Sequence, residues 1–204
     1  MKLFRMLSVK PWTAEGVLEN PDDEVAYNLP AEKVGLRIFL VVATMIFSLI
    51  AAVYLARMSL GDWRPLSDPW LLWPNTALLI ASSAALQWAI ISLRRGDKAG
   101  LKFGLVAGGV LAWAFLAGQL LAWQQLTSLG YFADMNPSNA FFYLITGLHG
   151  VHLLGGLVAW GRTMGKFRRG QDIAQLRLSV ELCTAYWHYL LVVWLIMFSL
   201  MLLT

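Results

Sequence analysis

The chain alternates between long apolar runs and short polar connections. Five runs of about 20 residues or more span Leu36–Ala56, Trp70–Leu93, Leu101–Trp123, Asn139–Trp160 and Val180–Leu203. About 20 apolar residues suffice for an α-helix to cross the hydrocarbon core of a bilayer. The runs lack the strict alternation of membrane β-strands, and backbone in lipid must satisfy its own hydrogen bonds. The pattern therefore predicts an all-α polytopic membrane protein, a bundle of five transmembrane helices.

The residues before the first run differ in character from the rest. Pro11, Pro21 and the acidic cluster 22–24 lie in a stretch with too few apolar residues for a core. We therefore expect a cytoplasmic N-terminal tail over residues 1–32, followed by one transmembrane domain over residues 33–204. The remaining connections are short and leave little room for a soluble domain.

Basic residues are unequally shared between the two predicted sides of the membrane. Alternate connections lie on the same side, and the side that includes the tail carries fourteen of the 16 Lys and Arg residues, whereas the other side has only Arg57 and Arg64. Because cytoplasmic loops are enriched in Lys and Arg, this bias predicts a cytoplasmic N-terminus and a periplasmic C-terminus.

Composition agrees with a membrane protein. Hydrophobic residues make up 58% of the chain and charged residues 14%, which excludes an ordinary soluble domain. The 16 basic and 12 acidic residues lie mostly between the apolar runs, so the basic excess reports membrane topology and predicts no nucleic-acid partner. Glycines at helical spacing, such as Gly104 and Gly108, predict close helix contacts. Those of the fourth run, among them Gly155 and Gly156, predict a slim helix buried against its neighbours.

Four ionisable side chains lie within the predicted spans and are the candidate functional residues. They are His149, His152, Glu181 and His188. Burying such groups in lipid is unfavourable, so each is by default a functional candidate. The two residues of each helix share a face, and adjacent antiparallel helices could bring all four into one polar cluster.

Three roles are open for these residues. The first is a metal or haem site, for which two histidines on one helix and a single acid are a poor ligand set. The second is a set of interhelical hydrogen bonds worth about 1 kcal/mol each. The third is a proton-linked or lipid-headgroup role, with Glu181 nearest the basic rim. No motif of a catalytic site is present, so the chain is expected to hold no catalytic residue and no resident metal.

Three ordered motifs resemble subunit III of the haem–copper terminal oxidases. Residues 141–152 read FFYLITGLHGVH, similar to the family's FFxxTGxHGxH. Glu181 is followed by Tyr-Trp-His at 186–188 and Val-Val-Trp at 192–194, similar to its E-x6-H pattern ending in YWHFxDVVW. Asn-Thr at 75–76, with Ser-Ser at 82–83, Trp88 and Gly118-Gln119, also fits. The match runs from about Lys33 to the C-terminus.

The resemblance implies a five-helix form of a subunit that binds no haem or copper itself. In that family, haem and copper lie in the partner subunit I. The subunit packs on subunit I, supports proton entry from the inner side, binds phospholipid and protects the enzyme during turnover. We therefore expect subunits I and II as partners in a bacterial cytoplasmic (inner) membrane, with either cytochrome c or quinol as electron donor.

Two positions depart from the family pattern. Ala43 stands where the first retained helix of the family carries a buried carboxylate, and Leu190-Leu191 replaces the segment that holds an aspartate. These changes keep open an accessory subunit of a nitric-oxide reductase. An independent haem-binding membrane cytochrome would use the same histidines and remains a further alternative.

Overall fold

Five α-helices account for most of the chain in the computed structural model, which describes residues 30–61, 63–64, 70–170 and 173–203. Each helix overlaps one predicted apolar run, and most extend beyond it. The helices are α3 (Ala31–Met58), α4 (Leu72–Arg94), α5 (Lys98–Ser128), α6 (Pro137–Arg168) and α7 (Ile173–Leu202). All five are long and apolar enough to cross a membrane. The described residues contain no strand, so the all-α prediction is confirmed. Of the predicted tail, residues 1–29 lie outside the described part.

Short polar signals set the ends of the helices. The Asp97 carboxylate accepts a hydrogen bond from the backbone of Ala99 at 3.0 Å and so caps α5. Asn136 caps α6 in the same way, with Pro137 as the first helical residue. Glycines with positive φ follow α4, α5 and α6, namely Gly96 (74°), Gly130 (86°) and Gly170 (65°). A left-handed residue terminates a helix without steric penalty only when it lacks a Cβ, which is why glycine stands at these sites.

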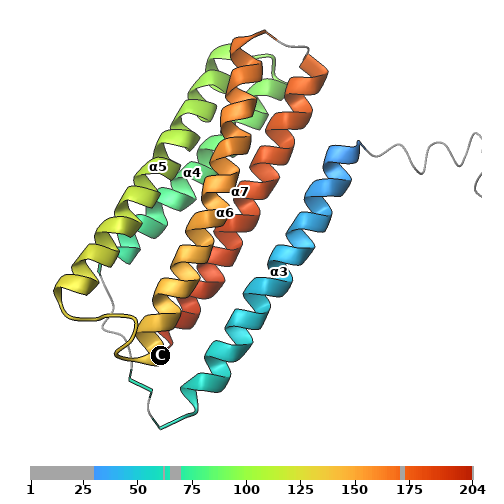
Figure 1. Cartoon of the computed structure of the whole chain (residues 1–204). Coiled ribbons are helices and arrows are strands. Elements are labelled where there is room, and N and C mark those ends of the chain that lie inside the picture. The colour runs from blue at the N-terminus through green and yellow to red at the C-terminus, as the bar shows by residue number, and fades with distance from the viewer. Residues whose placement is uncertain (1–29, 62, 65–69, 171–172, 204) are drawn as a thin grey trace, which may run out of the picture. The chain divides into compact units, whose positions relative to one another are not determined.

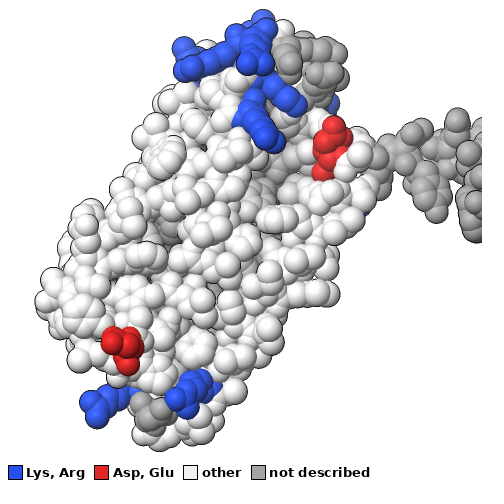
Figure 2. Space-filling view, viewed as in Figure 1, with Lys and Arg blue, Asp and Glu red and all other residues white. Residues whose placement is uncertain are grey.

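The chain divides into two units, residues 1–38 and Phe39–Thr204. The described part of the first unit is the start of α3. In the second unit, α4 packs against α5 and α7, and α6 packs against α5 and α7, so these four helices form a closed ring (Figure 1). Lys and Arg gather at the end where α6 leads into α7, and the middle of the visible face shows no charged side chain (Figure 2).

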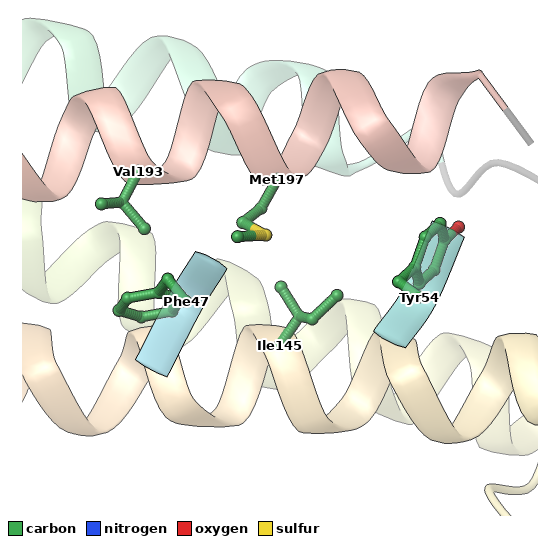
Figure 3. Close-up of a cluster of buried hydrophobic side chains, with 5 residues drawn as sticks. All are labelled: Phe47, Tyr54, Ile145, Val193 and Met197. Atoms are coloured by element: carbon green, nitrogen blue, oxygen red, sulfur yellow. The ribbon is translucent and has the colours of Figure 1, made fainter. Parts of the chain in front are cut away.

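The part of α3 in the second unit is attached by side chains. From Phe39 onwards, among the described residues, no Cα atom of α3 comes within 8 Å of one in another helix. Instead Phe47 and Tyr54 project into the groove between α6 and α7, where they meet Ile145, Val193 and Met197 (Figure 3). These five side chains are all nearly or fully buried. The apolar cluster therefore holds α3 without close backbone approach.

Candidate functional site

Hydrogen bonds between α4, α5 and α7 run through the interior of the ring. The indole N–H of Trp187 donates to Ser82 Oγ at 3.0 Å, and this hydroxyl donates to the carbonyl of Gly108 at 2.7 Å. The indole of Trp194 donates to Thr76 Oγ1 at 2.9 Å. Polar groups in hydrocarbon are stable only when they are paired. The tryptophans and hydroxyls of this interior thus bond one another across helices.

Asn75 extends the same interior network to α5. Its side-chain nitrogen donates to Gln119 Oε1 at 3.2 Å, and both side chains are buried. A Cβ at Gly118 would lie 2.3 Å from Asn75 Oδ1, so the glycine makes the room that the amide occupies. The Asn-Thr, Gly-Gln and Val-Val-Trp motifs, which lie far apart in the sequence, therefore meet in one region of the core.

His188 joins α7 to α4 through both ring nitrogens. Its Nε2 lies 3.0 Å from Gln87 Oε1, and its Nδ1 forms a short hydrogen bond with Ser83 Oγ. An amide oxygen only accepts, so Nε2 carries a proton and donates to Gln87 Oε1. The partly buried imidazole therefore bridges two helices.

His149 lies in the same ring of helices but has a different environment. It is 1% exposed, and its ring centroid lies 5.8 Å from that of Phe115 and 5.0 Å from that of Trp194. Within the described residues neither ring nitrogen has a hydrogen-bond partner. His149 therefore packs as an aromatic ring between α5 and α7.

His152 faces α3 rather than the interior of the ring. Its Nδ1 lies 2.9 Å from the carbonyl of Leu148, so this nitrogen carries the proton. Its ring centroid lies 5.2 Å from that of Phe47 and 6.0 Å from that of Phe39. The hydroxyl of Tyr186 donates to the backbone carbonyl of His152 at 2.8 Å. His152 is therefore part of the contact among α3, α6 and α7.

Glu181 lies near the end of the ring that carries most of the basic residues. Its Oε1 is 3.1 Å from Arg177 Nε and 4.0 Å from a terminal nitrogen of Arg94. The Glu181 side chain is 26% exposed and the two arginines are about 60% exposed. Exposed ion pairs of this kind contribute about 0–1 kcal/mol. The carboxylate thus links α7 weakly to the last turn of α4.

The four candidates do not form the single cluster that their spacing suggested. No hydrogen bond or ring contact joins any two of them in the part of the chain that the structure describes. The reason is geometric: His149 faces α5 and α7, whereas His152, three residues on, faces α3. Among the described residues, no three His, Cys, Asp or Glu side chains lie close enough to hold a metal ion.

The residue that stands in place of the family's buried carboxylate, Ala43, is itself buried. Ala43 is 1% exposed, and the adjacent Thr44 Oγ1 lies 3.1 Å from the hydroxyl of Tyr189. Thr44 also donates to the carbonyl of Leu40 at 2.7 Å, so the tyrosine is the donor to Thr44. This hydrogen bond between α3 and α7 was not anticipated from the sequence. Gln87 was also missed, although an amide within an apolar run is a visible signal.

Comparison with known proteins leads to the same family as the motifs that meet in the core. The profile of the family described as "Cytochrome c oxidase subunit III" matches residues 25–203. This chain belongs to the cytochrome c oxidase subunit III family. A "Probable cytochrome c oxidase subunit 3" of Mycobacterium leprae is 32% identical over 175 residues, covering 81% of this chain and 84% of the relative.

Two cyanobacterial relatives extend the subunit III comparison. "Cytochrome c oxidase subunit 3" of Thermostichus vulcanus is 30% identical over 188 residues, covering 90% of this chain and 88% of the relative. The protein of the same name in Synechocystis is 33% identical over 175 residues, covering 81% and 72%. The chain is thus an oxidase subunit III, a multi-pass membrane component of a multi-subunit oxidase.

Proposed function

We propose that this chain is a non-catalytic subunit III that stabilises subunit I of a proton-pumping terminal oxidase while oxygen is reduced to water. In this proposal subunit I holds the haems and copper, and subunit II and membrane phospholipids are further neighbours. The family match over residues 25–203 carries this proposal, and the pairing of His188 with Ser83 and Gln87, which ties α7 to α4, supports a structural role for that histidine. The names of the relatives favour cytochrome c as the electron donor.

The other three candidates support the same structural role. His149 packs between aromatic rings, His152 takes part in the contact with α3, and Glu181 pairs with arginines. In this proposal the three side chains keep the helices in register. They support proton uptake by subunit I only indirectly, by maintaining the surface of this chain that packs on subunit I.

The proposed location is a bacterial inner membrane with the N-terminal tail in the cytoplasm. The basic end of the ring then faces the cytoplasm, where Lys and Arg are enriched in membrane proteins. The connection between α5 and α6 faces the periplasm.

Purification of the tagged chain from membranes in mild detergent tests this function. We expect peptides of oxidase subunits I and II to co-purify, together with a haem absorption spectrum and oxygen consumption. After the chain is separated from its partners, its own spectrum should show no Soret band. A Soret band that stays with the isolated chain, or a nitric-oxide reductase catalytic subunit as partner, would contradict the proposal.

A further inference from the structure

The outer side of the seam between α4 and α7 carries an unusual polar group. Gln87 is exposed, and its Oε1 accepts the hydrogen bond from His188. Within the described residues its amide nitrogen makes no hydrogen bond. This leaves two N–H donors at the surface of the molecule, beside a partly buried imidazole.

Gln87 lies too deep for its amide to reach water easily. It precedes Arg94, at the end of α4, by seven residues, which is about 10 Å along a helix. An amide that faces hydrocarbon without a partner loses several kcal/mol of hydration. Acyl chains are therefore a poor neighbour for this part of the surface.

The surface around the pair is also shaped for a close approach. Ala84 lies one turn from Gln87 on α4, and Ala185 lies one turn from His188 on α7; both are exposed. Small side chains let the backbone of another helix come near in a membrane. The seam also exposes Trp88 and Val192, and the outer faces of α5 and α6 expose large apolar residues such as Val110, Trp113 and Val151.

We propose that a transmembrane helix of another oxidase subunit docks on the α4/α7 seam and presents an oxygen acceptor to the amide nitrogen of Gln87. The acceptor is a side-chain or backbone carbonyl oxygen, because the free groups of Gln87 are donors. The inference rests on the proposed function as a subunit of a larger oxidase. It goes further by assigning the face and the chemistry that the partner offers there.

Site-specific photo-crosslinking in the intact purified oxidase tests the assignment. Trp88 on α4 and Trp113 on α5 are a matched pair, 52% and 54% exposed, and each is replaced in turn by p-benzoylphenylalanine, which is similarly bulky. Val192, one turn from His188 on α7, provides a second probe of the seam if the Trp88 variant does not assemble. We expect another subunit to be crosslinked from Trp88 or Val192 and only lipid from Trp113.

A second measurement addresses the hydrogen bond itself. Gln87→Leu should lower the fraction of chain retained in the complex about threefold to tenfold during a detergent titration, as loss of one membrane hydrogen bond predicts. Val110→Leu, on the outer face of α5, is the control and should leave retention unchanged.

The outcomes separate the two proposals. If the chain co-purifies with the oxidase but the seam probes yield only lipid, or a second copy of this chain, the docking inference is wrong and the proposed function stands. Equal retention of the Gln87→Leu and Val110→Leu variants would likewise overturn the docking inference. A chain that purifies alone overturns both.

Discussion

His188, Trp187 and Trp194 each hydrogen-bond to a side chain of α4, so α7 is tied to α4 at two levels, one at residues 187–188 and one at Trp194. Each bond joins groups that would otherwise be unpaired in an apolar medium. Measured bonds of this kind in membrane proteins average well under 2 kcal/mol, since the separated helices also find partners. Their main effect is therefore on the register of the helices.

Replacement of His188 by leucine should weaken the association of the subunit more than it lowers the rate of oxygen consumption. The change removes the bonds to Ser83 and Gln87 and should destabilise the chain by about 1–2 kcal/mol. The measurement is the initial rate of oxygen uptake together with the midpoint of thermal dissociation of the complex. Val110→Leu, on the outer face of α5, is the control. Loss of the initial rate in an intact complex would instead indicate direct chemistry.

Ala43 illustrates how much of a site the sequence discloses at the level of single residues. The comparison of motifs showed that Ala43 stands where the family carries a carboxylate, so the sequence identified only a group that this chain lacks. Only the structure showed that Thr44, next to it, meets Tyr189 across 145 positions of sequence. No local pattern predicts a contact between residues so far apart.

At the scale of elements, α4 and α5 approach most closely at glycines. A Cβ at Gly104 would lie 2.6 Å from the carbonyl oxygen of Ala85 and 2.8 Å from the backbone nitrogen of Ala89. The predicted close contact is thus confirmed. Along α6 the prediction holds only in part: a Cβ at Gly156 would press on Trp187 and Tyr186, whereas Gly155 faces open space.

The Gly104→Ala variant should destabilise the contact between α4 and α5. The methyl group meets backbone atoms that cannot rotate away, and overpacking of this kind costs about 1–3 kcal/mol. Gly155→Ala, the matched control, has nothing within 4 Å and should be neutral or slightly stabilising. Thermal unfolding in detergent micelles compares the two. Equal midpoints would show that the α4–α5 interface can shift to accommodate the methyl group.

The whole molecule is asymmetric in charge from one end to the other. The connections that contain Arg95 and Arg169 lie at the basic end of the ring of α4–α7, and Asp134 lies in the connection between α5 and α6. Because the positive-inside rule concerns loops, this asymmetry is readable from the sequence before any contact is known.

Labelling with a membrane-impermeant maleimide tests the predicted orientation. Single cysteines at the exposed positions Lys98 and Asp134 are introduced in a Cys183→Ala background, since Cys183 is the one native cysteine. Asp134→Cys should react in intact spheroplasts, and Lys98→Cys only after permeabilisation. The reverse pattern would place the N-terminal tail in the periplasm.

The sequence by itself determined the number of helices, their approximate ends and the family, because these depend on the length of apolar runs, on local caps and on short motifs. It also singled out the four ionisable residues within the spans. Whether they meet depended on the rotation of each helix about its axis. His152 lies three residues after His149 on α6, and at this spacing its side chain faces α3 whereas that of His149 lies in the interior of the ring.

Only the tertiary structure decided the partners of these residues and the order of the helices around the ring. It showed that His188 bonds to Gln87, that α3 is attached by Phe47 and Tyr54, and that three distant motifs meet in one core. Such contacts arise from packing between segments far apart in the chain. A pattern along one helix records which residues avoid lipid, but not which neighbour they face.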